Sequence, residues 1–442
     1  MNLADMFQLQ QVADEEQTRR KRYKAAWEAY HGKMDAPLRK TKTDPNGEDN
    51  TIIAYSRLIV DTVVSWLFGK EPAFNLDVET ERNDQEQHLD QVWEANKKML
   101  LLQKLAINGG VCGHLFMKIV DRSPLTGNLP RLVILDPANV SVKWSDEDID
   151  EVLRYRIQWN AIDQQTGKPV VRRQDIDRDQ GGWAIRDLVS RPNDNRFETL
   201  AESRWRYSWA PVVDSQHLPV PNEYYGLSEI ESLILALNKA INFGFSNNNR
   251  IQRAHGHPKT VATGVGARDI DVSPDNVIVL PNKDASIRNL EMQSDMASNF
   301  GQLDRLVDAI LKLARIPPLA FGDVKNIPEL SGVALAIYFQ PLLQKVASLR
   351  LTYGYMLTET NRRLLDLGGH GDDLRPTNRW PELLPQNRKE QADAALILEQ
   401  LGVSQETILE DLGYDPAVER QRREATGAEL GEELLKSFER GQ

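Results

Sequence analysis

The chain has 442 residues, a formal net charge of -11, a pI near 5.3 and a mean hydropathy of -0.49. This length allows two or three domains with a sizeable core. No run of 18 apolar residues is present, so we expect a soluble globular protein with no membrane span. A protein that grips DNA by neutralising phosphates normally carries a basic face or stripe, and none stands out here.

The sequence holds no motif for catalysis, a cofactor or a metal. Cys112 is the only cysteine, which excludes an internal disulfide and a thiolate cluster for zinc or iron–sulfur. P-loop and dinucleotide-type glycine loops are absent, as are the His-Glu-x-x-His and Gly-x-Ser-x-Gly patterns. Cys112 and His114 lack a third group that would complete a catalytic set, and His255 and His257 lack a third metal ligand. We therefore expect no enzyme activity, no cofactor and no metal.

The first part of the chain predicts helices. Residues 1–35 form a polar amphipathic helix that ends near Gly32. Its basic cluster, residues 19–24, fits either a contact with nucleic acid or a partner, or a solvated face offset by nearby acids, and we favour the solvated face. A connector rich in Pro, Gly, Asp and Asn follows. The next predicted elements are helices at Ser56–Phe68 and Asp84–Leu105, a turn at Gly109–Gly113 and a strand at Leu115–Val120.

From Leu129 to Ser215 the pattern changes to strands. Between Val152 and Trp159, apolar and polar side chains alternate, which predicts a strand with one buried and one wet face. A turn signal follows, and then a further strand at Val170–Ile176. These features predict an antiparallel meander.

Two apolar helices, at 227–254 and 295–315, bracket a small module. Ser228 and Glu231 form a capping-box pattern at the start of the first helix. Its apolar stripe fades beyond Ser246, so we expect the far end to project away from the body. If the two helices run antiparallel, the module lies at their far end, as the tip of a stalk.

The stretch from Ser294 to Gly369 organises the chain. Its first helix stops at Pro317–Pro318, because neither proline can donate to the helix ladder. A polar loop follows, and then a helix of roughly 50 Å from Val333 to Leu367. We expect Pro341 to kink this helix without ending it, since the apolar pattern continues beyond it.

The C-terminal part predicts two short helices, Ala394–Leu401 and Ser404–Leu412. Their arrangement is similar to a helix-turn-helix. The second helix carries no Lys or Arg, however, so it lacks the charge needed to approach phosphates. DNA readout by this region is therefore disfavoured.

Seven segments, taken in order, resemble the portal proteins of tailed bacteriophages, the family typified by the SPP1 portal. They are AWEAYHG at 26–32, SRLIVDTVVSWLFGKEP at 56–72, GLSEI at 226–230, RIPPLAFG at 315–322, SGVAL at 331–335, LGVS at 401–404 and LGYDP at 412–416. Their order and spacing over about residues 20–420 make the resemblance specific.

The resemblance implies an α+β portal fold with seven parts. These are a wing of helices and antiparallel strands (1–226), a stem helix (227–255), a small α/β clip (256–293), a second stem helix (294–316), a tunnel loop (317–332), a long kinked wing helix (333–380) and a helical crown (381–442).

The resemblance also implies a function and a set of partners. The chain would form a ring, usually of twelve copies, at one capsid vertex of the virion, after assembly in the host bacterial cytoplasm. Double-stranded DNA would pass through it non-specifically during packaging and ejection. The terminase large subunit, the major capsid protein, a scaffolding protein and a head-completion or adaptor protein would be further partners, and no membrane is involved.

An acidic composition suits such a conduit. Each phosphate that a Lys or Arg neutralises deepens a binding well that the moving duplex must leave, whereas acidic walls repel the duplex. In the tunnel loop, Asp323, Lys325, Asn326 and Glu329 are the candidates for facing DNA. The alternative for each is a bond to the neighbouring subunit's loop.

Two other function classes remain open from the residues alone. A capsid-associated scaffolding or adaptor protein would be smaller and mostly helical, without a stalk and tip. A monomeric enzyme with an unrecognised site would have a defined small-ligand pocket and would form no ring.

Overall fold

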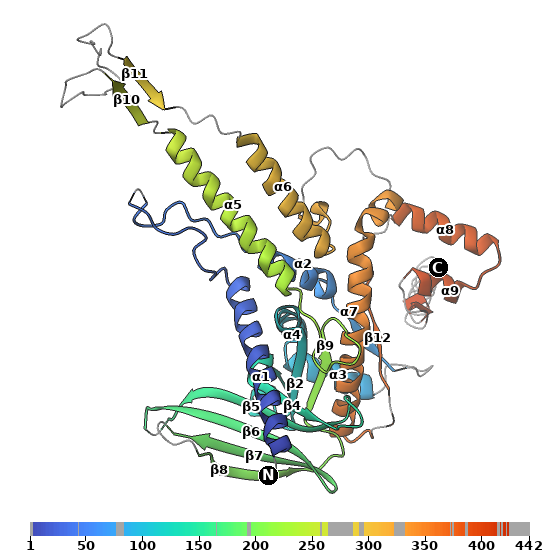
Figure 1. Ribbon diagram of the computed structural model, residues 1–442. Helices are drawn as coiled ribbons and strands as arrows, with labels where there is room; N and C mark the ends of the chain where they lie inside the picture. Colours follow the sequence, from blue (N-terminus) through green and yellow to red (C-terminus); the bar gives the residue numbers. More distant parts are fainter. Residues whose placement is uncertain are drawn as a thin grey trace, which may run out of the picture.

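The structure is a computed structural model, and the body of the protein combines helices with antiparallel sheets (Figure 1). It describes residues 3–42, 44–76, 84–164, 166–191, 196–256, 259–263, 286–290, 296–321, 332–371, 373, 375–384, 388–412, 416, 419–420 and 422–423. The mixed class predicted from the sequence is confirmed.

The N-terminal helices build the main core. They are α1 (Leu3–Tyr30), α2 (Tyr55–Phe68), α3 (Asp84–Ala95) and α4 (Lys98–Cys112). α2 buries one face, including Ile59 and Val63, against α4 and α7 (Gly332–Leu367). Apolar side chains spaced three and four residues apart give α2 this buried face.

The single helix expected at Asp84–Leu105 is wrong in two respects. It breaks between α3 and α4 at Lys97, whose φ of 56° is left-handed. It also continues to Cys112, so the glycines expected to turn the chain lie within α4. A Cβ on Gly110 would lie 3.0 Å from Val60, so this glycine lets α4 approach α2 closely. Gly113, with φ 85°, ends the helix.

Two antiparallel sheets follow. One has the strand order β3-β2-β9 and the other the order β4-β5-β6-β7-β8, as the predicted meander requires. The strands are β2 (His114–Val120), β3 (Arg131–Leu135), β4 (Val140–Trp144), β5 (Val152–Ile162), β6 (Pro169–Asp179), β7 (Gly182–Ser190), β8 (Glu198–Trp205) and β9 (Val212–Gln216). A second core, which includes Phe116, Tyr155 and Trp183, joins the two sheets.

A stalk rises from this body (Figure 1). Helices α5 (Ser232–Gly256) and α6 (Met296–Leu313) lie side by side. The antiparallel strands β10 (Lys259–Thr263) and β11 (Ser286–Leu290) lie at its far end. The apolar run Asn-Val-Ile-Val-Leu at 276–280 predicts a further strand in this module, and it lies outside the described residues.

The first stalk helix begins at Ser232, five residues later than predicted. Leu227 is paired with Leu218 in an isolated β-bridge, and the Glu229 N–H donates to the Gly110 carbonyl at 2.8 Å. These tertiary bonds hold the segment out of the helix. The Ser228–Glu231 pair does form, because the Ser228 N–H donates to the Glu231 carboxylate at 3.0 Å.

The long helix α7 runs from Gly332 to Leu367 with Pro341 inside it, and it crosses the body to the strand β9. After it, β12 (Thr377–Arg379) pairs with β1 (Ala73–Asn75). The C-terminal helices α8 (Arg388–Gln400) and α9 (Gln405–Asp411) contact each other beside the body.

Candidate functional site

The segment between α6 and α7 is the predicted functional loop, and the structure describes its two ends. A 3-10 turn, Pro318–Phe321, follows α6, and α7 begins at Gly332. The four candidates Asp323, Lys325, Asn326 and Glu329 lie outside the described residues. The described geometry therefore concerns what anchors the loop.

A buried ion pair anchors the start of the loop. Lys345 of α7 is 5 % exposed, and its ammonium pairs with the carboxylate of Glu229, which lies just before α5. The same ammonium donates to the Ala314 carbonyl at 2.7 Å, directly after α6. One side chain thus joins α7 to the base of both stalk helices, and Ala314 lies three residues before the double proline that opens the loop.

His217 and Tyr353 complete this cluster. His217 Nε2 lies 3.3 Å from Glu229 Oε1, and because a carboxylate only accepts hydrogen bonds, Nε2 is the donor. His217 Nδ1 lies 2.8 Å from the Tyr353 hydroxyl on α7. A Cβ on Gly109 would lie 2.5 Å from that hydroxyl, so α4 contacts the cluster through a glycine.

Electrostatics keep Glu229 ionised. Burial alone would raise the pKa of its carboxyl, but the Lys345 ammonium and His217 lower it to about 2. Burial, and the charge of Glu229, in turn raise the pKa of the Tyr353 hydroxyl. We call His217, Glu229, Lys345 and Tyr353, with the Ala314 carbonyl, the junction cluster.

Residues 39–42 and 44–56 form a strap that lies along α5. Asn238, Asn242 and Ser246, spaced four residues apart, bond to its backbone. Asn242 Oδ1 accepts from the Ile53 N–H at 2.9 Å, and Ser246 Oγ accepts from the Thr51 N–H at 2.8 Å. Asn238 Nδ2 donates to the Ile53 carbonyl at 2.7 Å.

Charged groups fasten the strap farther along the stalk. Arg253 and Arg250 bond to the Asp49 carboxylate at 2.7 Å and 3.2 Å, and both approach Asp44 within 3.8 Å. Burial would raise the pKa of Asp44, but the backbone N–H groups of Glu48 and Asp49 lower it. The far end of α5, which we expected to project free, is therefore covered on one face. The four-residue spacing of Asn238, Asn242 and Ser246 was the signal that sequence reasoning missed.

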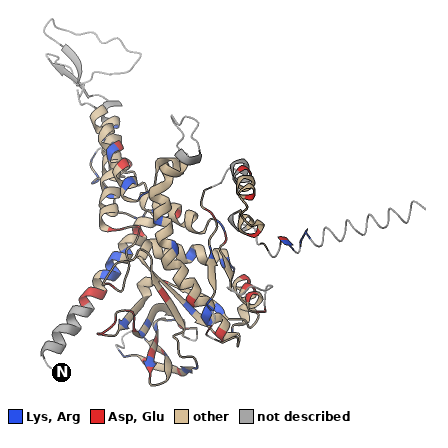
Figure 2. Ribbon diagram, turned by 90° about the vertical axis from the view of Figure 1, so that its right-hand side faces the viewer, with Lys and Arg blue, Asp and Glu red and all other residues tan. Residues whose placement is uncertain are grey.

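The basic cluster of α1 is exposed at Lys21, Arg22 and Lys24, as we favoured from the sequence, but Arg19 departs from that prediction. Arg19 is 8 % exposed and donates to the carbonyls of Pro137 and Val140 at 3.2 Å and 3.0 Å. Its guanidinium also lies 4.2 Å from the centre of the Tyr225 ring. Arg19 is therefore a structural tie between α1 and the start of β4. Figure 2 shows basic and acidic residues interspersed over the described helices and sheets.

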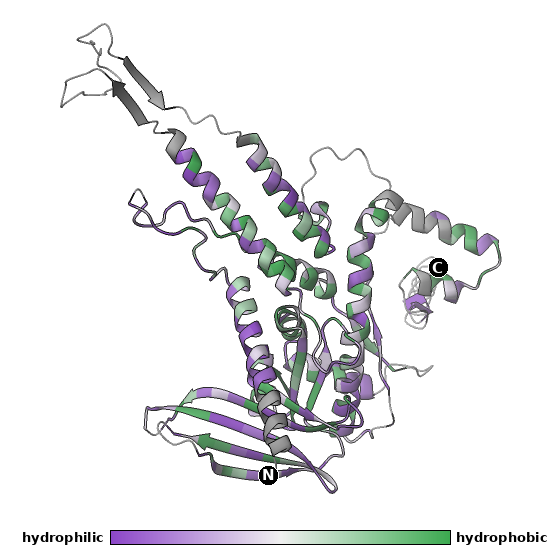
Figure 3. Cartoon of the chain, in the orientation of Figure 1, coloured by the Kyte–Doolittle hydropathy of each residue, from purple (hydrophilic) through white to green (hydrophobic). Residues whose placement is uncertain are grey.

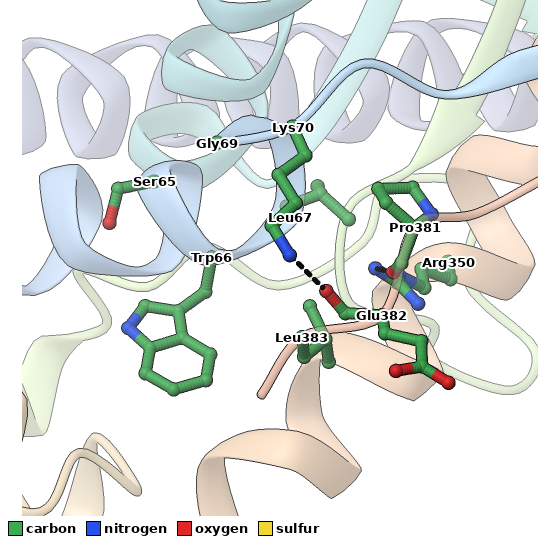
Figure 4. Close-up of a pocket in the computed structure, with 9 residues that line it drawn as sticks. All are labelled: Ser65, Trp66, Leu67, Gly69, Lys70, Arg350, Pro381, Glu382 and Leu383. Carbon is green, nitrogen blue, oxygen red and sulfur yellow. Dashed lines mark hydrogen bonds between the residues drawn. The ribbon is translucent and has the colours of Figure 1, made fainter. Parts of the chain in front are cut away.

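A cavity of about 260 Å³ lies between α2, α7 and the segment after β12 (Figure 4). Lys70 Nζ donates to the Glu382 carbonyl at 3.1 Å, and Arg350 Nη2 donates to the Pro381 carbonyl at 2.6 Å. Arg350 also lies over the Trp380 ring, 5.2 Å from its centre. Because Lys70 and Arg350 both donate to backbone carbonyls, they fix the segment that leads from β12 to the C-terminal helices.

The residues that invited a catalytic interpretation have structural surroundings. Cys112 is buried, and burial raises the pKa of its thiol. His114 Nε2 lies 3.0 Å from Asp214, which also accepts from the Tyr155 hydroxyl at 2.6 Å. Among the described residues, no group of three or more His, Cys, Asp or Glu side chains is arranged to hold a metal. Nor does any described helix have the length and apolar character needed to cross a membrane.

Comparison with known proteins gives one family match. A family model described as phage portal protein, SPP1 Gp6-like, matches residues 9–170 and 223–430. The unmatched stretch between them contains most of β6 and all of β7, β8 and β9. No curated protein sequence matches the chain.

Solved structures also match. A chain from the neck of an empty gene transfer agent particle, computed with C6 symmetry, is 13 % identical, with a TM-score of 0.48. A chain from the virion of a native gene transfer agent particle is 12 % identical, with a TM-score of 0.49. In both cases the match covers 82 % of this chain and 90 % of the other.

Proposed function

Because the chain belongs to the SPP1 Gp6-like family of phage portal proteins, we propose that it forms the ring through which double-stranded DNA enters and leaves a capsid. It is a portal protein, and its place is the portal vertex of the virion. Terminase would drive DNA inward through this ring, and the same passage would later serve ejection.

We assign the parts of the chain to this function as follows. The described elements up to residue 226 form the wing, α5 and α6 the stem, and β10 and β11 belong to the clip. Residues 317–332 form the tunnel loop, α7 is the long wing helix, and residues 381–442 form the crown. Pro341 would bend α7 because it lacks the N–H that the helix ladder needs.

One observation carries the proposal most directly. The junction cluster fixes the end of α6, the approach to α5 and the middle of α7 to one another through the Lys345–Glu229 ion pair and the Ala314 carbonyl. The loop that would face DNA is therefore mounted on a rigid base, while the stalk carries β10 and β11 away from the body. A conduit needs this combination, because the loop meets a moving polymer and the stem must keep its shape.

Charge supports passage without tight binding. The net charge of -11 is repeated in every copy of a ring. Since like charges repel, the duplex would not settle on the wall. In the loop we assign Asp323, Lys325, Asn326 and Glu329 to the surface that meets DNA or the neighbouring loop.

We propose the following partners. Copies of the chain would close a ring, which we expect to have twelve members. The clip would bind the terminase large subunit first and a head-completion or adaptor protein later. The wing and crown would contact the major capsid protein and the scaffolding protein.

The alternatives have less support. A scaffolding or adaptor protein needs no stalk with a strand pair at its tip, and this chain has both. An enzyme needs a site, and in the described part of the chain the polar clusters around Glu229 and Asp214 are sealed by structural partners. The portal family is a structural family, which agrees with this reading.

The test is DNA packaging by heads that carry altered portals. Deleting residues 323–329 should leave rings intact and reduce the DNA retained in heads. Heads that fill normally with this deletion would refute the assignment of the tunnel loop.

A further inference from the structure

Helix α5 has three faces, and two of them are covered within the chain. One contacts α6, where a Cβ on Gly244 would lie 2.5 Å from Leu303. A second carries Asn238, Asn242 and Ser246, which bond to the strap. Helical spacing leaves a third face between them.

This third face is apolar and exposed. We call it the free face of α5; its residues are Leu233, Ala236, Lys239, Ala240 and Phe243. The apolar members are spaced three, four and three residues apart, which places them in one row. Leu233 is 65 % exposed and Phe243 is 53 % exposed. Figure 3 shows that hydrophobic residues recur along the described length of α5.

The only charge in this row is also without a partner in the described chain. Lys239 is exposed and forms no ion pair with another described residue. Helix α6 carries exposed acidic residues instead. Asp304 and Asp308, four residues apart, are exposed and have no described cation partner. The buried apolar side chains described on α6 are Leu303, Ile310 and Leu311. Asp304 and Asp308 lie on the side of the helix that also carries Leu311, but both are exposed, so their carboxylates are accessible to another chain.

We infer that the free face of α5 binds the outer face of α6 in the next copy of the chain, with Lys239 beside Asp304 and Asp308. This inference rests on the proposed ring and specifies its contact in the stem. The two surfaces differ, so the contact is heterologous and repeats around a ring, whereas a contact between identical faces would stop at a dimer. Burial of the apolar row stabilises the contact, and the pairing of Lys239 with the two acids fixes how the helices align.

The first experiment places a charge in the apolar row. In the full chain, Leu233→Glu and Phe243→Glu should raise the concentration at which half the chains are in rings by about tenfold or more, because each ring contact then buries a carboxylate. Ile162→Glu is the matched control, because Ile162 is 72 % exposed on β5, outside the stalk. Mass photometry gives the ring fraction, and circular dichroism checks that the altered chains fold.

The second experiment exchanges charges between copies. One variant carries Lys239→Glu, and another carries Asp304→Lys with Asp308→Lys. Each alone brings like charges together at every contact and should assemble poorly. Mixed in equal amounts, the two variants should restore rings in which they alternate, because every contact then pairs opposite charges. Native mass spectrometry should detect equal copies of the two chains.

The outcomes separate this inference from the proposed function. Rings that form normally from Leu233→Glu and Phe243→Glu chains, or single charge variants that assemble as well as the mixture, would overturn the stem contact and leave the portal function intact. An unaltered chain that forms no ring, even with capsid and scaffolding proteins, would overturn the ring and the contact together.

Discussion

Replacing Lys345 by Met tests whether the junction cluster is a structural anchor. The substitution keeps an unbranched side chain of similar length, so packing in α7 changes little. It removes the ammonium that pairs with Glu229 and donates to the Ala314 carbonyl. Glu229 is then a buried carboxylate whose remaining partner in the cluster is His217, at 3.3 Å.

The expected cost is large. Breaking a buried ion pair by removing one partner typically costs about 3–5 kcal/mol, because it leaves an uncompensated charge. Adding Glu229→Gln to Lys345→Met removes that charge. The double variant should therefore lose less stability than the sum of the losses of the two single variants. Lys312→Met is the control, because Lys312 is exposed on α6 and should change stability by about 0.5 kcal/mol or less.

The effect of Lys345→Met should depend on pH. In the unaltered protein the pKa of Glu229 is lowered from 4.5 to about 2. The contribution of this carboxylate to folding stability is therefore fully present above pH 4.5 and is lost as pH falls towards 2. That shift corresponds to about 3 kcal/mol. Without Lys345, burial should raise the pKa of Glu229 above 4.5. The carboxyl then takes up a proton as pH drops from 7 to 4.5, so the loss of stability caused by Lys345→Met becomes smaller.

Urea unfolding, followed by tryptophan fluorescence at pH 7 and pH 4.5, measures this difference. We expect the difference in the free energy of unfolding between the unaltered protein and Lys345→Met to be larger at pH 7 than at pH 4.5. A difference below about 1 kcal/mol at pH 7, or one that does not change with pH, would refute the reasoning that the pair is buried and ionised.

Three further predictions concern the loop, the tip and the strap. Deleting residues 323–329 should leave ring mass unchanged and lower the DNA content of heads, and unchanged DNA content would contradict the loop assignment. Replacing residues 259–291 with a short Gly/Ser turn should preserve rings and abolish capture of terminase in a pull-down, whereas undiminished capture would contradict the clip assignment. Asp49→Ala should loosen the strap by removing the nearer of the two carboxylates that pair with Arg250 and Arg253 and leaving only Asp44. Protease should then cut the strap at least about tenfold faster than in an Asp14→Ala control; equal rates would show that the strap is held by other bonds.

Local sequence patterns predicted the elements whose periodicity is set by one buried face. The three-and-four spacing in Ser56–Phe68 and the alternation in Val152–Trp159 correspond to α2 and β5. The position of a module at the far end of a stalk followed from two apolar helices that bracket a short segment, and the structure shows the strands β10 and β11 there. In each case the burial pattern repeats within a single element, so it can be read without knowing what packs against it.

The remaining features depend on contacts between distant segments. Glu229 and Lys345 are 116 residues apart, and nothing near either residue in the sequence marks the pair. Gly110 suggested a turn, whereas it allows α4 to approach Val60 of α2. Arg19 was grouped with solvated charges because carbonyl partners 118 residues away cannot be seen locally. The loop candidates Asp323, Lys325, Asn326 and Glu329 stay predictions.

Native mass spectrometry of the purified chain, with negative-stain images of the same sample, shows whether the chain forms a portal ring. We expect rings of about twelve copies with a central hole, formed by the chain alone or with its scaffolding protein. A chain that stays monomeric alone and with capsid and scaffolding proteins would contradict this expectation.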